Sequence, residues 1–151
     1  MRIVVQRVSE ASVRIDEKIV GSISHGLMVL VGVEITDVQT DADYLIQKLI
    51  NLRIFNDEEG KMNLSIQDVG GELLIVSQFT LHASTKKGNR PSYIRAARPE
   101  QAIPLYSYFI EQAQKELQSK IQTGEFGADM KVSLVNDGPV TILIDSANKD
   151  F

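Results

Sequence analysis

Residues 72–80 read Glu-Leu-Leu-Ile-Val-Ser-Gln-Phe-Thr, and this stretch decides the fold. Its first half is apolar at successive positions, which is typical of a strand that is buried on both faces. Polar residues begin abruptly at Ser77. The segment therefore predicts a central strand whose end, Ser77–Thr80, lies where a rigid scaffold commonly presents functional groups.

The chain before this strand predicts antiparallel β structure followed by one helix. Alternating apolar residues predict four strands, over residues 2–8, 11–16, 19–24 and 27–34, with turns at 16–18 and 25–26. From Thr40 the apolar residues recur every three or four positions as far as Leu52, which indicates an amphipathic helix with Thr40 or Asp41 as its N-cap. A polar turn follows at 56–60, and residues 62–69 fit no single pattern.

After the central strand, the sequence predicts a loop, a second helix and a hairpin. The loop covers residues 83–99, and long loops in small domains are usually functional. The helix is expected to run from Pro99 to about Gln122, with Gly124 ending it. Strands over 130–136 and 140–145 are expected to be joined by a tight turn at 136–139. Together these elements predict one α+β domain over residues 1–151, with barrel-like, mainly antiparallel layers and two main helices.

Composition limits the class of protein further. The chain has 151 residues, 43% of them hydrophobic and 24% charged, which is typical of a soluble globular domain. It has no cysteine, so thiol chemistry and disulfides are excluded, and a reducing cytosol is compatible. The first residues lack the features of a signal peptide, and the longest apolar run, 27–33, is far shorter than the roughly 20 residues that cross a bilayer. A cytoplasmic location without membrane contact is expected.

Positive charge is concentrated in one segment of an acidic chain. The net charge is −4, yet the residues between Glu72 and Glu100 include no acidic residue. The basic residues of this segment are Lys86, Lys87, Arg90, Arg95 and Arg98. A phosphate-contacting loop is one interpretation, and an ordinary solvated surface loop is the other.

Common catalytic motifs are absent. The only histidines are His25 and His82, in no metal-binding arrangement, so no metal or other cofactor is expected. No glycine-rich nucleotide motif occurs, and nothing around Ser77, His82 and Asp137 resembles a nucleophile elbow.

The polar end of the central strand remains as the candidate site. In an extended strand Ser77 and Phe79 would face one side and Gln78 and Thr80 the other, so backbone groups would have to contribute to a shared ligand site. The alternative interpretation of the same residues is strand termination followed by a turn of the kind that Ser and Thr favour. Gly138-Pro139 likewise reads as a tight turn when taken alone.

Several long motifs, in one order, resemble a single family. The opening MRIVVQRVSEASV, LRIFNDEEGKMNLS (52–65), SQFTL (77–81), KKGNRPS (86–92), GEFGADM (124–130) and VNDGPVT (135–141) are similar to D-aminoacyl-tRNA deacylases. The similarity covers nearly the whole chain. It implies the fold of that family and an enzyme that hydrolyses the ester between a D-amino acid and the terminal adenosine of tRNA.

The resemblance also implies roles for individual residues. The family is a homodimer in which a Gly-Pro motif with a cis peptide bond, here Gly138 and Pro139, enters the partner's active site. Main-chain carbonyls there would exclude an L side chain, and because glycine has no side chain to exclude, glycyl-tRNA should also be hydrolysed. Ser77, Gln78, Phe79 and Thr80 would form the floor that holds the substrate. The ribose 2′-hydroxyl of the RNA would help to activate the water, with Thr80 as nucleophile the alternative.

Further residues are expected around this site. Phe126 and Met130 resemble the pocket wall of the family, although core packing would account for them too. Lys86, Lys87 and Arg90 are candidates for contacts to tRNA phosphates. Arg7 either braces the Gly-Pro segment through a carbonyl hydrogen bond or simply faces solvent. Two other functions stay open: a noncatalytic nucleic-acid-binding module, and an acyl hydrolase that uses Thr80 or Ser77 on simple esters.

Overall fold

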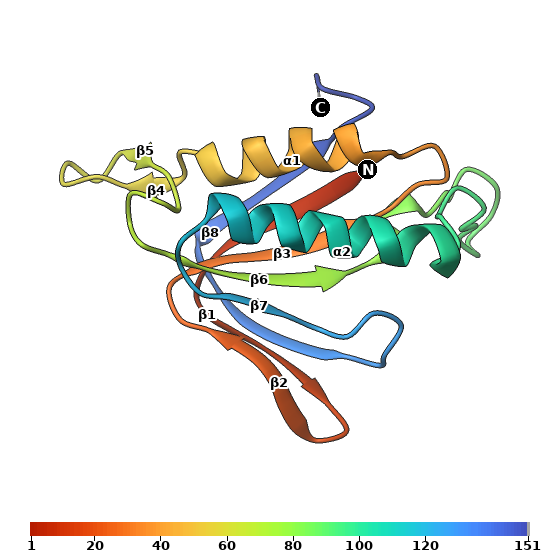
Figure 1. Ribbon diagram of the computed structural model, residues 1–151, viewed down its shortest axis with the longest axis horizontal. Helices are drawn as coiled ribbons and strands as arrows, with labels where there is room; N and C mark the ends of the chain where they lie inside the picture. The colour runs from red at the N-terminus through yellow and green to blue at the C-terminus, as the bar shows by residue number, and fades with distance from the viewer. Residues whose placement is uncertain (151) are drawn as a thin grey trace.

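The computed structural model describes residues 1–150 and has a curved mixed sheet with two helices packed on one face (Figure 1). The α+β class is confirmed. In chain order the elements are β1 (Arg2–Ile15), β2 (Lys18–Ile23), β3 (Gly26–Gly32), α1 (Gln39–Asn51), β4 (Phe55–Asn56), β5 (Met62–Leu64), β6 (Glu72–Ser77), the 3₁₀ turn η1 (Phe79–His82), α2 (Pro99–Glu116), β7 (Ile121–Thr123) and β8 (Lys131–Asp145).

β6 is buried on both faces, as the sequence predicts. Leu73 and Ile75 pack into the larger of two hydrophobic clusters, which lies between the sheet and both helices. Leu74 and Val76 point the other way, into a smaller cluster enclosed by the curl of the sheet. Alternate residues of β3 divide in the same manner. The end of β6 therefore lies where the two clusters meet.

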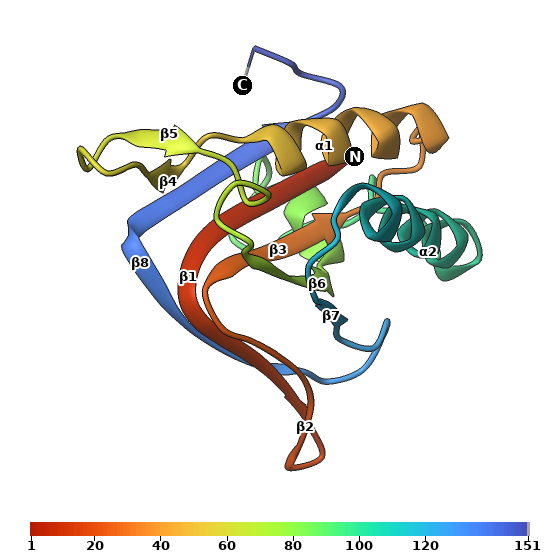
Figure 2. The same cartoon turned by 60° about the vertical axis from the view of Figure 1, so that its left-hand side comes forward.

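The sheet curls until its ends approach each other, which confirms the barrel-like shape (Figure 2). β1 pairs antiparallel with β2, β3 and β8, whereas the β3–β6 and β6–β7 pairs are parallel. Across the gap between β2 and β7, Lys120 Nζ donates a hydrogen bond to the carbonyl of Ser22 at 2.7 Å. A Cβ at Gly21 would lie 2.8 Å from the carbonyl oxygen of Thr123, so this approach requires glycine.

Two long strands replace two predicted pairs of shorter ones. β1 is continuous where separate strands over 2–8 and 11–16 were expected. The predicted hairpin at 136–139 is wrong, because β8 is also one strand and pairs with β1 along most of its length, from Arg2 opposite Asp145 to Arg14 opposite Lys131. The turn residues are accommodated by register shifts in β8 rather than by a reversal of the chain.

The second helix is shorter than predicted. α2 ends at Glu116 instead of Gln122, and Ile121–Thr123 forms β7, which pairs with the free edge of β6. Pairing with a buried strand edge outweighs local helix propensity here. α1 begins at Gln39, with Val38 rather than Thr40 or Asp41 as its N-cap residue. Residues 62–69, ambiguous in the sequence, contribute β5, which pairs with β4.

Asp145 closes the long β1–β8 pair and should give the fold acid sensitivity. Arg2 donates to its carboxylate from Nε at 2.9 Å and from Nη2 at 2.7 Å. Burial alone would raise the pKa of Asp145, but these hydrogen bonds, two backbone N–H donors and the charge of Arg2 hold it below its ordinary value of 3.8. The stabilisation is therefore complete above that value and is lost as pH falls through the lower pKa of the folded state.

As the pH falls, the free energy of unfolding of Asp145→Asn should accordingly decrease less than that of the wild type. Urea unfolding from pH 6 to pH 2 measures the effect. The control is Asp129→Asn, whose ion pair with Lys131 is exposed on both sides and should contribute little. If Asp145→Asn lost stability between pH 6 and pH 2 as steeply as the wild type, Asp145 would not be the source of the acid sensitivity.

Both helices of residues 1–150 are too polar or too short to cross a lipid bilayer.

Candidate active site

The end of β6 leaves the sheet at Ser77. Ser77 is paired with Val31 of β3, and the next N–H, that of Gln78, donates to the carbonyl of Val31 at 2.7 Å. β3 ends one residue later, so no neighbouring strand remains to pair with. Extension of the strand to Thr80 was therefore a wrong prediction. The backbone turns into η1 instead.

This turn brings Gln78 and Thr80 together. Gln78 Nε2 donates to Thr80 Oγ1 at 2.6 Å. Phe79 is 54% exposed and meets the ring of Tyr93 edge to face, with centroids 5.1 Å apart. Among residues 1–150, no ionisable side chain is hydrogen-bonded to the Thr80 hydroxyl. The Thr80 hydroxyl is thus paired with an amide rather than with a base.

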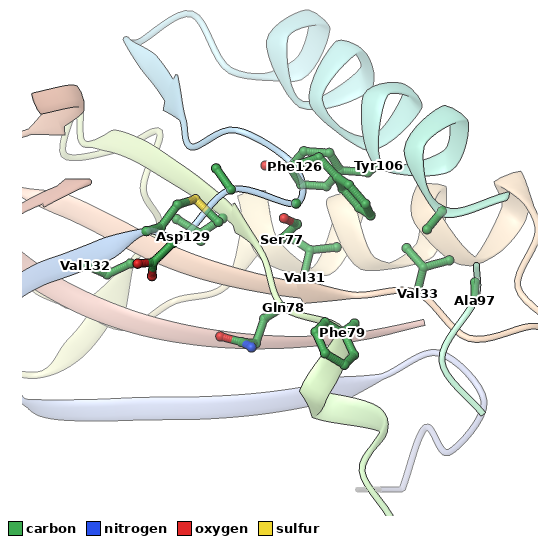
Figure 3. Close-up of a pocket in the computed structure, with 15 residues that line it drawn as sticks. Val31, Val33, Ser77, Gln78, Phe79, Ala97, Tyr106, Phe126, Asp129 and Val132 are labelled. Carbon is green, nitrogen blue, oxygen red and sulfur yellow. The ribbon is translucent and has the colours of Figure 1, made fainter. Parts of the chain in front are cut away.

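A cavity of about 280 Å³ opens beside this turn (Figure 3). Ser77, Gln78 and Phe79 line it, together with Val31 of β3 and Val33, which directly follows that strand. Ala102 and Tyr106 of α2 and residues 126–130 complete most of its wall. The cavity is therefore largely apolar, with the polar end of β6 on one side.

Phe126 and Met130 both lie in this wall. Phe126 is half-buried, and its ring centroid is 5.8 Å from that of Tyr106. Met130 packs against Gly124, where an added Cβ would lie 2.4 Å from the Met130 sulfur. Both side chains also pack against the hydrophobic clusters, so the pocket wall and the core are continuous.

Tyr106 is a pocket residue that the sequence reasoning missed. Its hydroxyl donates to the carbonyl of Ile75 at 3.1 Å, inside β6. Burial raises the pKa of Tyr106 well above its ordinary value, so the group stays protonated and fixes the strand rather than transferring protons. The spacing of Ala102, Tyr106, Phe109 and Ala113 on one face of α2 was the available signal.

Gly138 and Pro139 do not line the cavity of their own chain. Both are exposed, in the middle of β8, and the bond between them is cis. Gly138 has φ +135°, and a Cβ there would lie 2.8 Å from Val140 Cγ2. The backbone at this position therefore requires glycine.

Arg7 is buried and braces this segment from β1. Its Nε donates to the carbonyl of Asp137 at 2.9 Å, directly before Gly138, and its Nη1 donates to the carbonyl of Ile54 at 2.6 Å. The side chain is therefore not solvent-facing, which settles the two alternatives in favour of the carbonyl contact. One guanidinium joins β1, the β4 region and β8.

The loop over residues 83–98 contributes Ala97 to the cavity, but its basic residues lie outside it. Residues 83–98 contain no helix or strand, but Ser84 and Ser92 exchange backbone hydrogen bonds of 2.8 and 2.9 Å across the base of its tip. Lys86, Lys87 and Arg90 are exposed on that tip, and within residues 1–150 none of them has an acidic partner at ion-pair distance. Arg95, by contrast, is bound to Glu34.

No group of three or more His, Cys, Asp or Glu side chains in residues 1–150 is arranged to hold a metal ion. The polar groups that line the cavity are the hydroxyls of Ser77 and Tyr106, the amide of Gln78, the carboxylate of Asp129 and backbone groups.

Solved structures define the class of this fold. A structure described as "c-Myc DNA Unwinding Element Binding Protein" matches with a TM-score of 0.92 at 42% identity, covering 96% of this chain and 98% of that chain. One described as "Structural Analysis of a probable eukaryotic D-amino acid tRNA deacylase" matches with a TM-score of 0.79 at 17% identity, over 95% and 98%. The second comparison shows a shared deacylase fold.

Sequence relatives identify the family. A protein of Flavobacterium psychrophilum named D-aminoacyl-tRNA deacylase is 63% identical over 150 residues, which is 99% of this chain and 100% of that protein. A protein of Bacteroides thetaiotaomicron with the same name is 60% identical over the same shares. The profile described as D-Tyr-tRNA(Tyr) deacylase matches residues 4–145. The chain belongs to this family of hydrolytic enzymes.

Proposed function

We propose that this chain is a single-domain, cytoplasmic enzyme that hydrolyses the ester of D-aminoacyl-tRNA to free amino acid and tRNA. Family membership over residues 4–145 supports the reaction. The observation that carries the assignment of the site is the cavity beside Ser77–Phe79, where the polar end of β6 meets an apolar wall. An aminoacyl group on the terminal adenosine would bind there, against Phe126 and Met130.

The chemistry proposed for this site needs no strong base. An aminoacyl ester hydrolyses in water, so the enzyme has to orient the carbonyl, stabilise the developing oxyanion and place a water. Ser77, Gln78 and Phe79 supply the polar and backbone groups of the floor, and Thr80, which is not among the lining residues, is joined to it by the hydrogen bond from Gln78. The ribose 2′-hydroxyl next to the ester assists the attacking water.

Selection against L-aminoacyl esters is assigned to Gly138 and Pro139 of a second copy of the chain. Their exposure, and their absence from the cavity of their own chain, support a contribution across a homodimer. β8 pairs only with β1 among the strands of residues 1–150, and Val132 and Val135 on it are exposed. Main-chain carbonyls at the gate would exclude an L side chain and leave a D side chain free.

Parallel assays on D-tyrosyl-tRNA, L-tyrosyl-tRNA and glycyl-tRNA test the function and the gate together. We expect hydrolysis of the D ester and of the glycyl ester, because glycine offers no side chain to exclude, and no hydrolysis of the L ester. Equal hydrolysis of the D and L esters would show that Gly138 and Pro139 do not exclude L-aminoacyl esters. Glycyl-tRNA that resists enzyme concentrations able to clear the D ester would show that selection does not act by exclusion. Sedimentation at the assay concentration tests the dimer.

Thr80→Ala should slow hydrolysis by less than about tenfold. The substitution removes one hydroxyl whose partner is the Gln78 amide, and losing one such hydrogen bond costs about 1 kcal/mol. Single-turnover rates on D-tyrosyl-tRNA measure the effect, with Thr80→Ser as the matched control that keeps the hydroxyl. Complete loss for Thr80→Ala, with an intact fold, would favour Thr80 as a covalent nucleophile.

Phosphates of the tRNA are proposed to bind Lys86, Lys87 and Arg90. All three are exposed and none has an acidic partner within residues 1–150, which supports this, and such contacts add affinity and salt dependence without reading sequence. The competing function is a noncatalytic nucleic-acid-binding module, which the description of the structural neighbour as a DNA-element-binding protein favours. Binding of tRNA without turnover of any ester would support the module, and cleavage of simple esters without RNA would support a general acyl hydrolase.

A further inference from the structure

His82 is a buried polar residue whose ring makes no hydrogen bond within residues 1–150. The residue is 3% exposed, and within the described part of the chain neither ring nitrogen has a partner. Buried polar side chains are normally hydrogen-bonded, and leaving one unsatisfied costs folding free energy. An apolar residue of similar size would avoid that cost. The imidazole therefore needs an explanation other than stability.

The position of His82 connects it to the floor of the proposed site. It is the last residue of η1, the turn that carries Phe79 and Thr80. The ring rests directly on β3, since a Cβ added at Gly32 would lie 3.1 Å from His82 Cδ2. The same Cβ would lie 3.0 Å from the carbonyl oxygen of Gln78. The His82 ring and the backbone of Gln78 therefore lie against the same residue of β3.

One buried carboxylate faces this ring. Glu34, 6% exposed just beyond β3, has its Oε2 3.7 Å from His82 Nδ1, slightly beyond hydrogen-bond length. Its other oxygen, Oε1, binds the guanidinium of Arg95 in the basic loop. The backbone of Arg95 is tied to the same place, because its carbonyl accepts the N–H of Ile35 at 3.1 Å. Glu34 thus faces the turn η1 through His82 and binds the loop through Arg95.

The remaining charges near the turn are already engaged. Arg2 of β1 donates from Nη1 to the carbonyl of Leu81 at 2.6 Å, and its other nitrogens bind Asp145 of β8. Asp37 accepts the backbone N–H of Glu34 at 2.6 Å and binds the amino group of Met1. Glu34 is accordingly the acidic group available to the imidazole.

We propose that His82 is a positioning residue for hydrolysis, which Glu34 attracts toward β3 so that the turn carrying Phe79 and Thr80 is fixed beside the cavity. Because Glu34 also binds Arg95, the same carboxylate links the placement of the turn to the anchoring of the basic loop. The inference rests on the proposed role of residues 77–80 and adds a residue outside the cavity to it.

Two substitutions at this position separate positioning from packing. His82→Leu removes both ring nitrogens but keeps an apolar side chain, whereas His82→Gln keeps an amide that can donate to Glu34. Urea unfolding and steady-state hydrolysis of D-tyrosyl-tRNA are measured for both. For His82→Leu we expect stability equal to or above that of the wild type, with kcat reduced at least about tenfold and KM unchanged, since small displacements of reacting groups are costly. His82→Gln should recover most of kcat.

The alternatives give different results. If His82→Leu keeps kcat within twofold, or if kcat falls only in proportion to a loss of folded protein, the proposal is overturned. In a Glu34→Gln background, His82→Leu should cause no further loss of kcat. If His82→Leu lowered kcat there as much as in the wild type, Glu34 would not be what holds His82 in place. A wild type that leaves D-tyrosyl-tRNA intact would overturn the proposed function and this inference with it. An active wild type beside an equally active His82→Leu variant overturns this inference alone.

Discussion

Gly26→Ala should prevent stable folding, with an expected loss of more than about 4 kcal/mol in the free energy of unfolding. Gly26 is opposite Glu72 at the first position of the parallel β3–β6 pair. An added Cβ would lie 1.8 Å from the carbonyl oxygen of Glu72 and 2.6 Å from its backbone nitrogen. Both atoms belong to a backbone held in the sheet, so the two central strands would have to separate.

Soluble yield and urea unfolding measure this effect. Gly60→Ala is the matched control, because a Cβ there meets nothing within 4 Å and only the positive φ of +77° opposes it. That substitution should cost roughly 1 kcal/mol. A Gly26→Ala protein as stable as the Gly60→Ala protein would mean that β3 and β6 do not start in the register described.

Arg7→Leu should lower the free energy of unfolding by about 2–5 kcal/mol, because it leaves the carbonyls of Ile54 and Asp137 without their donors. Arg7 is 7% exposed, so water cannot replace the guanidinium freely. Under the proposed function, hydrolysis of D-tyrosyl-tRNA should fall as well, since the backbone before Gly138 loses its support. Chemical unfolding and single-turnover rates measure the two effects.

Two control variants, Arg14→Leu and Arg7→Lys, are compared with Arg7→Leu. Arg14→Leu removes an exposed arginine from the same strand and should change stability by less than about 0.5 kcal/mol. Arg7→Lys keeps the charge but not the planar fork that reaches two carbonyls, so it should restore little. Full stability of Arg7→Lys would show that charge alone, and not the geometry of the guanidinium, supports the segment.

The elements that were predicted correctly are those whose pattern depends on one segment alone. The apolar run of β6 indicates burial on both faces, and the spacing of Ala42, Leu45, Ile46 and Leu49 gives α1 its buried face. The predicted hairpin at 136–139 failed because its residues are a good turn signal taken alone. What extends the strand through them is pairing with β1, more than a hundred residues earlier in the chain.

The residues of the candidate site fall into the same two groups, those that a single segment indicates and those whose contacts join distant segments. Ser77 and Gln78 could be predicted because polar residues interrupt an apolar strand there, and Phe126 and Met130 through their motif. The partners of Arg7 could not be derived, because Ile54 and Asp137 are 47 and 130 residues away in sequence. The pairing of Arg95 with Glu34, 61 residues earlier, is equally invisible before the fold is known. Contacts of this kind arise only from packing of distant segments.

The pairing of β1 with β8 also has a consequence for the order in which the protein is made. Arg2 pairs with Asp145, so β1 leaves the ribosome long before β8, and its second edge stays unpaired until β8 has been made. Until then β1 presents a long row of free N–H and C=O groups, the kind of edge that pairs with other chains. Synthesis therefore delivers Gly138 and Pro139 together with β8, the strand that covers this edge of β1.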